Sequence, residues 1–285
     1  MVSELISALL IAVVQGLTEW MPISSSGHLI LAEKLLGYSG GLMFDVALHF
    51  GTLMAVFVYF GGDIVDIVRD LFLWRWNSEN GRLGILIVIA TIPAAIAGYL
   101  LRGIFEEVFH SLGVVALGFG VTGLFLLIAS VKNSRPTLKR ISGKLKKMIV
   151  RGEGFDNAGK FNYSNFSYGK ALLMGIAQAF ALFPGVSRSG ATISSGLLLG
   201  LKEKSAMKFS FLMSIPIIFG ANILVIGNKT LPPSLVWATM VSFVVGLLAM
   251  HVLYNWVLTS RRNLRWFGIY ALLLAIALGI WVVLM

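Results

Sequence analysis

The stretch TEWMPISSSGHLI, Thr18 to Ile30, interrupts an apolar N-terminal segment with a carboxylate, a proline, three serines, a glycine and a histidine. The residues before it, about 2–17, are largely apolar, as expected of a helix inside a bilayer. Backbone that is not helical at membrane depth is tolerated only where protein or a water-filled cavity satisfies its hydrogen bonds. The stretch therefore predicts a helix that breaks inside the membrane, with its polar groups lining a cavity.

The composition of the whole chain is that of a polytopic membrane protein. Hydrophobic residues make up 57% of the 285 residues, charged residues only 13%, and the mean hydropathy is +0.86. Soluble domains have about 45–50% apolar and about 25% charged residues. Apolar runs of roughly 20 residues, enough to cross the hydrocarbon core as helices, occur at about 42–60, 83–101, 112–131, 206–226, 234–257 and 266–285.

Two further apolar segments, about 2–17 and 171–183, stop at blocks rich in proline, serine and glycine before they are long enough to cross. We therefore expect an all-α membrane protein with six full transmembrane helices and two re-entrant helix-loop-helix elements. Glu4 and the lack of Lys or Arg before the first apolar run argue against a cleaved signal peptide. The chain has no cysteine, which excludes disulfides, thiolate metal sites and a cysteine nucleophile.

The distribution of charge predicts the topology. The segment 132–170 carries ten Lys or Arg residues and two acidic ones, a large part of the net charge of +10. Such a cluster between spans favours a cytoplasmic loop that faces anionic lipid, rather than a nucleic-acid site. Alternation then places 61–82 and 258–265 in the cytoplasm and 102–111 and 227–233 outside.

With this topology, the first interrupted segment enters the membrane from the external face and the second from the cytoplasm. Each half of the chain is one re-entrant element followed by three spans, and the halves have opposite orientation. We expect a single membrane domain, 1–285, with a first repeat (1–131), a basic cytoplasmic loop (132–170) and a second, inverted repeat (171–285). In such repeats the broken helices meet near the bilayer midplane and build the site there.

The two interrupted blocks also resemble each other in sequence. Without gaps, QGLTEWMPISSSGHLI (15–30) and QAFALFPGVSRSGATI (178–193) share five identities in sixteen positions. An internal repeat should leave such traces, although small residues are common in membrane helices and chance similarity is the alternative. The identical pairs are Gln15 and Gln178, Ser24 and Ser187, Ser26 and Ser189, Gly27 and Gly190, and Ile30 and Ile193.

The ionisable residues of the two blocks are Glu19, His28 and Arg188, and such groups at membrane depth are candidates for function. An arginine fork and the free N–H groups of a helix N-terminus suit a phosphate or pyrophosphate. With serines as nucleophiles and Glu19 and His28 as acid or base, the blocks hold the parts that phosphoryl transfer needs. The alternatives are structural: Glu19 paired with Arg188, His28 bonded to its own turn, and serines that only pack.

Polar residues inside the predicted spans are weaker signals. Asp45 and His49 are four residues apart, on one helix face, and Thr52 follows about one turn later. They fit a metal pair, but a supporting hydrogen-bond network or an interfacial position explains them more readily. No GxxxxGK[ST] sequence is present, which disfavours an ATP-driven P-loop enzyme.

The two blocks resemble the signatures of the undecaprenyl-diphosphate phosphatase family, also called the bacitracin-resistance family: QGLTEWMPISSSGHL the first, and PGVSRSGATI the second. FDVALHFGTL (44–53) and TIPAAIAGYL (91–100) are similar too, so only the basic loop lacks the resemblance. The family implies an enzyme of the cell membrane that removes the terminal phosphate of a C55 polyprenyl diphosphate. It recycles the lipid carrier for envelope polymers, confers bacitracin tolerance and opens its site toward the external face.

By motif position the resemblance implies that Glu19 is the essential acid, Ser25 the nucleophile, His28 an acid or base and Arg188 the phosphate-binding residue. Gln15 departs from the family, since many members have a glutamate there and a glutamine cannot act as a base. A divalent cation, Mg²⁺ or Ca²⁺, is implied with Glu19 as a ligand, and no organic cofactor. The residues expected to contact substrate are Ser24, Ser26, Gly27, Ser187, Ser189, Gly190 and Thr192.

The expected partners are a polyprenyl diphosphate and membrane lipids, with no nucleic acid, and a homo-oligomer is compatible with the sequence. Attack by Ser25 and direct attack by water both remain open. A lipid transporter or flippase is the alternative function, because inverted repeats with broken helices are common in transporters.

Overall fold

The computed structural model describes residues 2–109, 111–131, 163, 166–225, 233–257 and 259–284. Most of the predicted basic loop 132–170 and of the predicted external loop 227–233 lies outside these residues. The described residues form helices and no strand, so the all-α class is confirmed. The α-helices are α1 (Val2–Trp20), α2 (Ser25–Leu36), α3 (Gly41–Tyr59), α4 (Gly61–Phe72), α5 (Glu79–Leu100), α6 (Arg102–Val108), α7 (Leu112–Val131), α9 (Tyr168–Phe180), α10 (Arg188–Leu198), α11 (Glu203–Val225), α12 (Pro233–Val252) and α13 (Leu264–Leu284). A π-helix, Leu253–Val257, continues α12, and a 3₁₀ turn, Arg261–Asn263, precedes α13.

Six helices of the described part are long and apolar enough to cross a membrane. Each coincides with a predicted span, with ends that differ by about five residues or fewer, so the polytopic membrane class is confirmed. The candidate spans are Gly41–Tyr59, Glu79–Leu100, Leu112–Val131, Glu203–Val225, Leu235–Val257 and Arg261–Leu284.

The segment 61–82, predicted as a loop, contains the helix α4. Its apolar residues recur at helical spacing: Ile64 and Ile67 pack against the core, whereas Val65 and Phe72 are exposed. The charge of this segment correctly suggested that it lies outside the spans, but charge carries no information about the local periodicity that forms a short amphipathic helix. The short helix α6 in the segment 102–111 was missed for the same reason.

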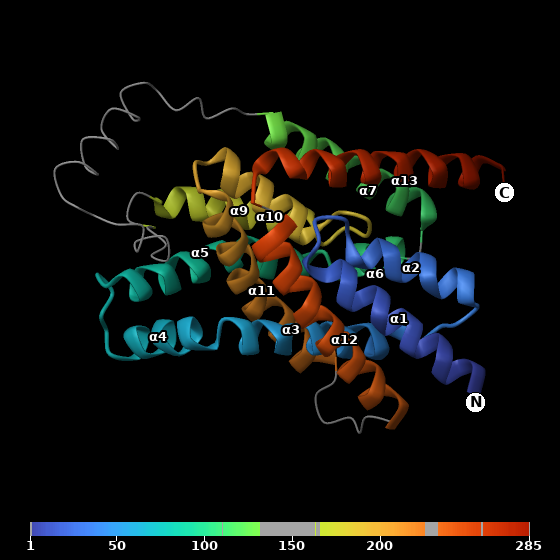
Figure 1. The fold of residues 1–285 in the computed structure, drawn as a ribbon, viewed down its shortest axis with the longest axis horizontal. Coiled ribbons are helices and arrows are strands. Elements are labelled where there is room, and N and C mark those ends of the chain that lie inside the picture. Colours follow the sequence, from blue (N-terminus) through green and yellow to red (C-terminus); the bar gives the residue numbers. More distant parts are fainter. Residues whose placement is uncertain are drawn as a thin grey trace.

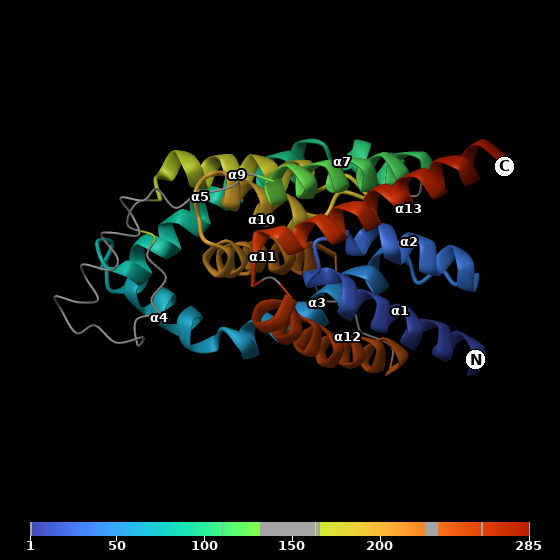
Figure 2. The same ribbon diagram turned by 45° about the horizontal axis from the view of Figure 1, so that its top comes forward.

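Both predicted helix breaks are present. The chain leaves the helical conformation between α1 and α2 at residues 21–24, which include Pro22, and between α9 and α10 at residues 181–187. Figures 1 and 2 show α1 and α9 beginning at opposite ends of the molecule and running toward its middle, where the two breaks lie. That each hairpin returns to its own face of the membrane stays a prediction.

The first break comes later than expected, because α1 continues past residue 17 to Trp20. Thr18, Glu19 and Trp20 are all compatible with a helix, and Pro22 is the first residue that is not. Glu19 therefore lies in the last turn of a helix rather than in the loop. A helix holds a side chain more rigidly than a loop does, which suits a functional carboxylate.

The packing between the halves is reciprocal. The helices of the two halves pair in order: α1 with α9, α2 with α10, α3 with α11, α5 with α12 and α7 with α13. In this pairing, the contact of α1 with α12 corresponds to the contact of α9 with α5. The contact of α3 with α12 likewise corresponds to the contact of α11 with α5. The last helices of the halves, α7 and α13, lie side by side (Figure 1). A two-fold relation between repeats produces this pattern, while the orientation of each repeat in the membrane stays a prediction.

Trp20 anchors the first break in the core. Its side chain is fully buried, and its ring lies 5.1 Å from that of Phe211 on α11 in an edge-to-face arrangement. The carboxylate that precedes it in sequence is thereby carried into the centre of the helix bundle.

Candidate active site

Glu19 is the centre of the site. It is 5% exposed, and Arg188 Nη2 donates to its Oε1 at 2.7 Å. Ser25 Oγ donates to Glu19 Oε2 at 2.6 Å, and Gln15 Nε2 donates to the same oxygen at 3.0 Å. A buried carboxylate is costly unless it is paired and hydrogen-bonded, and these donors supply both. The structure thus brings together three of the predicted catalytic residues, Glu19, Ser25 and Arg188.

Arg188 reaches Glu19 from the second broken helix, 169 residues later in the sequence. It is the first residue of α10, and its Nη1 donates to the main-chain carbonyl of Ser210 on α11 at 3.2 Å. Its guanidinium lies 5.4 Å from the Trp20 ring, a distance at which a cation and an aromatic face attract. The side chain keeps 14% of its surface exposed. Arg188 is held in place, yet a ligand can still reach it.

The two helices that begin at the breaks have the same N-terminal cap. Ser24 accepts a hydrogen bond from the Gly27 N–H at 3.3 Å, and Ser187 accepts one from the Gly190 N–H at 3.0 Å. Ser24 adopts a positive φ of 68°, which is uncommon outside glycine and aims the chain sharply into α2. Aligned residues of the two blocks therefore hold equivalent positions, and two helix N-termini point their free N–H groups toward the breaks.

The other serines repeat the pattern as well. Ser24 and Ser26 share a hydrogen bond at 3.3 Å, and Ser187 and Ser189 share one at 3.2 Å. Ser189 Oγ also donates to the main-chain carbonyl of Met21 at 2.8 Å, which ties the second hairpin to the first break. The serines thus join the two hairpins at the place where they meet.

Burial separates the predicted substrate contacts into two groups. Thr192 is fully buried and bonded to the Arg188 carbonyl at 2.7 Å and to the Ser210 hydroxyl at 2.6 Å. Ser187 and Ser189 are 1% exposed and also engaged in protein contacts. Contact of these three with substrate stays a prediction. Ser25, Ser26 and Arg188 keep part of their surface exposed.

Gly27 and Gly190 allow the hairpins to approach each other. A Cβ atom on Gly27 would lie 2.6 Å from the Phe119 ring and 3.3 Å from Gly185 Cα. A Cβ on Gly190 would meet the Ser187 side chain at 2.9 Å and the Pro22 carbonyl at 3.3 Å. Each glycine thus faces the break of the opposite hairpin. Their packing role is visible in the structure, and a contact with substrate stays a prediction.

His28 is not brought to Glu19. Its Nδ1 lies 2.7 Å from the Ser24 carbonyl, and its Nε2 lies 2.7 Å from the Tyr270 hydroxyl on α13. The imidazole stacks on the Tyr270 ring and meets Phe119 edge-on. Both ring nitrogens are thus engaged away from the carboxylate, and the predicted acid or base role of this residue stays a prediction.

A different histidine, His49, lies close to Glu19. His49 on α3 has its Nε2 3.5 Å from Glu19 Oε2. Its spacing from Asp45 had suggested a supporting network or a metal pair, but the structure bonds His49 Nδ1 to the Asp45 main-chain carbonyl at 2.7 Å and not to its carboxylate. The sequence held no signal that connects His49 to Glu19, because the two residues lie on different helices and in different motifs.

The donors around Glu19 fit a divalent cation only in part. Among the described residues, no group of three or more histidine, aspartate or glutamate side chains is arranged to hold a metal ion. Gln15 Oε1, however, is buried beside the carboxylate without a hydrogen-bond partner. One carboxylate and one amide oxygen suit a cation such as Mg²⁺ that takes its remaining ligands from water and substrate phosphates.

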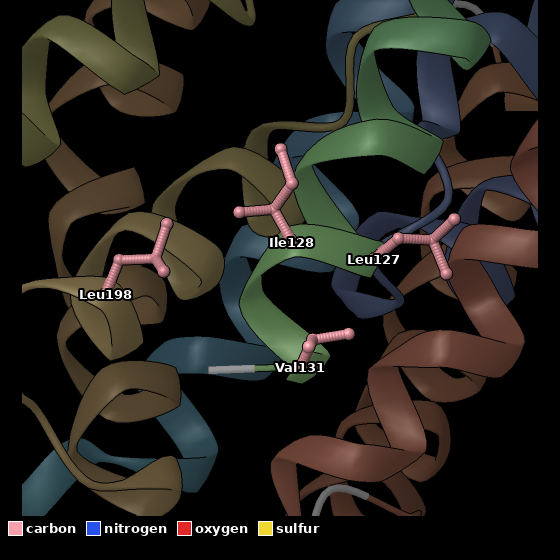
Figure 3. Close-up of a pocket in the computed structure, with 4 residues that line it drawn as sticks. All are labelled: Leu127, Ile128, Val131 and Leu198. Carbon is pink, nitrogen blue, oxygen red and sulfur yellow. The ribbon is translucent and has the colours of Figure 1, made fainter. Parts of the chain in front are cut away.

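A pocket of about 540 Å³ lies apart from this cluster (Figure 3). It is lined by Leu127, Ile128 and Val131 of α7 and by Leu198 at the end of α10 opposite to Arg188. None of the predicted site residues lines it, and its lining is apolar. The four lining side chains offer no hydrogen-bond donor to a phosphate.

The chain is thus a polytopic helical membrane protein in which two broken helices bring together an arginine, a carboxylate and a serine hydroxyl. The protein-family model described as bacitracin resistance protein BacA matches residues 8–277, and the chain belongs to this family. The match includes both broken-helix motifs. It confirms the family that the two motifs indicated.

The chain is also similar to individual proteins over most of their length. A protein of Rubrobacter xylanophilus is 41% identical, covering 95% of this chain and 96% of its own, and one of Caldicellulosiruptor bescii is 39% identical, covering 94% of each. One of Trichlorobacter lovleyi is 44% identical over 78% of this chain and 74% of its own. Each of the three is named undecaprenyl-diphosphatase.

Proposed function

We propose that this protein hydrolyses undecaprenyl diphosphate, or a similar polyprenyl diphosphate, to the monophosphate and inorganic phosphate. The observation that carries the proposal is the Glu19, Ser25 and Arg188 cluster at the meeting point of two broken helices inside a membrane-spanning bundle. The names of the similar proteins support it. The reaction regenerates the lipid carrier for envelope polymers and confers resistance to bacitracin.

Arg188 and the helix N-termini bind the diphosphate. A guanidinium fork forms charge-assisted, bidentate hydrogen bonds with phosphate oxygens, and the N-termini of α2 and α10 add oriented N–H groups. Since phosphoryl transfer depends mainly on positioning and on stabilisation of charge, these groups do much of the catalytic work. Arg188 Nη2 donates to Glu19, so a bound phosphate competes with this carboxylate for the guanidinium.

The 2.6 Å hydrogen bond between Ser25 and Glu19 joins a nucleophile to a base. In the covalent route, Ser25 Oγ attacks the terminal phosphorus, its proton passes to Glu19, and the polyprenyl monophosphate leaves. Water then cleaves the phosphoserine and releases inorganic phosphate. In the direct route, Glu19 takes the proton from a water molecule that attacks the same phosphorus, and Ser25 orients that water. Both routes use the same contacts.

A divalent cation, Mg²⁺ or Ca²⁺, would be held by Glu19 and by Gln15 Oε1, the buried oxygen without a hydrogen-bond partner. Such a cation supplies charge neutralisation for the phosphate oxygens. Chelation with EDTA should then lower phosphate release, and added Mg²⁺ or Ca²⁺ should restore it.

The site should open toward the external face of the cell membrane. The proposal rests on the family resemblance and on the positive-inside rule, which places the arginine-bearing segment 61–82 and the basic segment 132–170 in the cytoplasm. In sealed vesicles of known orientation, right-side-out membranes should release phosphate from added substrate without a detergent. Release by inside-out membranes alone would contradict this orientation.

The test of the function itself uses purified protein in detergent, where no gradient exists. We expect phosphate release from undecaprenyl diphosphate by the wild type, a loss of more than about 100-fold in Arg188→Ala, and no change in the control Arg75→Ala, whose side chain is 60% exposed. A lipid transporter, the alternative function, would bind the substrate without releasing phosphate. That outcome would refute the enzyme assignment.

A further inference from the structure

His49 approaches the carboxylate from a third element, the membrane-spanning helix α3, which belongs to neither broken-helix motif. Its Nε2 is 3.5 Å from Glu19 Oε2. The His49 side chain is 27% exposed, whereas that of Glu19 is 3% exposed. The imidazole is therefore the more accessible of the two groups.

The hydrogen bond at the other nitrogen fixes the orientation of this ring. Nδ1 lies 2.7 Å from the main-chain carbonyl of Asp45, which can only accept, so Nδ1 carries a proton. Nε2 then faces Glu19 either with a lone pair, which the carboxylate would repel, or with an N–H, which it attracts. At 3.5 Å this contact has the length of an ion pair and is longer than a short hydrogen bond, and an N–H at Nε2 requires a ring protonated on both nitrogens.

The contact between His49 and Glu19 matters because Arg188 has two binding partners in the proposed reaction. It pairs with Glu19 at 2.7 Å, and in the proposed reaction it also binds phosphate. When it turns to the substrate, Glu19 loses its closest positive partner, and a buried carboxylate without compensation is strongly disfavoured. Within the described part of the chain, His49 is the other basic side chain in an ion-pair contact with Glu19.

We propose that His49 is a positioning residue that holds the Glu19 carboxylate through Nε2–H while Arg188 moves to the terminal phosphate of the prenyl diphosphate. The inference rests on the proposed function. His28 cannot replace it in this role, because both of its nitrogens are engaged with Ser24 and Tyr270.

Two amide variants separate the two nitrogens of the ring. Gln can place its amide N–H near the position of Nε2 and can still donate to Glu19, whereas Asn reaches only the position of Nδ1 and the Asp45 carbonyl. The experiment measures kcat, KM and Tm of purified protein with farnesyl diphosphate as the substrate. The control is His251→Gln, an exposed histidine on α12 outside the cluster.

We expect His49→Asn to lower kcat about 10- to 100-fold, the effect of a small misplacement of a catalytic group. His49→Gln should stay within about threefold of the wild type, and all Tm values should agree. Equal kcat for the Asn and Gln variants, impaired or not, would overturn the proposal, as would a loss in His49→Asn that is explained by a lower Tm. If the wild type itself releases no phosphate from either farnesyl or undecaprenyl diphosphate, the proposed function fails instead.

Discussion

One carboxylate side chain serves two partners in this site. Glu19 Oε1 faces the arginine that binds phosphate, and Oε2 faces the serine that is the nucleophile or orients water. The chemistry therefore depends on a single residue held at the end of a helix. The residues that meet here come from the four helices α1, α2, α3 and α10, so their order in the sequence does not reveal their contacts.

The first residue-level prediction concerns the charge of this carboxylate. Glu19→Gln keeps the size of the side chain but removes the base, and we expect kcat to fall about 10²- to 10⁴-fold. Phosphate release by purified protein measures the effect. Glu203→Gln, a carboxylate paired with Arg261 outside the cluster, should retain activity. Full activity in Glu19→Gln would exclude a proton-transfer role.

Ser25 decides between the two chemical routes. Ser25→Ala should lower phosphate release at least about 100-fold in the covalent route, and acid-quenched wild-type protein should then contain phosphoserine in the peptide that carries residue 25. In the direct route the variant keeps a larger share of its activity and no phosphoserine forms. Ser130→Ala, which loses only a hydrogen bond to the Leu127 carbonyl, serves as the control.

At the scale of a residue, the sequence predicted which residues of the two motifs are functional candidates. It did not predict which residues of other helices contact them. Glu19, Ser25 and Arg188 could be predicted because each is an unusual residue type at membrane depth beside a helix break. His49 could not, since its spacing connects it only to Asp45 on the same helix. The hydrogen bond between His28 and Tyr270, 242 residues away, could not be predicted either.

At the scale of an element, the two broken helices are the functional unit. Proline and glycine fix where each helix stops, a serine caps the helix that follows, and a glycine three residues later lets the opposite break approach. These local rules made both breaks predictable. The helix α4 was missed because its residues were interpreted through their charge and not through their spacing.

The element-level prediction is steric. Gly27→Ala places a Cβ 2.6 Å from the Phe119 ring, so the hairpin must shift. We expect a loss of about 1–3 kcal/mol in stability, typical of overpacking, and reduced phosphate release. Gly220→Ala on α11 is the matched control, because a Cβ there meets no atom within 4 Å. Equal Tm values for the two variants would contradict the close approach.

At the scale of the whole molecule, the account predicts that the halves have opposite orientation in the membrane. The chain has no cysteine, so single introduced cysteines report accessibility without background. Ser39→Cys, between α2 and α3, should react with a membrane-impermeant maleimide in intact cells. Lys202→Cys, between α10 and α11 at the corresponding place in the second half, should react only after permeabilisation. Both positions are exposed in the structure. Labelling of both in intact cells would contradict the topology.

The central claim is that the site cleaves the terminal phosphate from a lipid diphosphate. The most direct measurement is ³¹P NMR of purified protein incubated with undecaprenyl diphosphate in detergent. The account predicts that the two diphosphate signals are replaced by one lipid monophosphate signal and one inorganic phosphate signal of equal intensity, and that Arg188→Ala slows this conversion. An unchanged lipid diphosphate, or the appearance of inorganic pyrophosphate in place of the monophosphate, would contradict it.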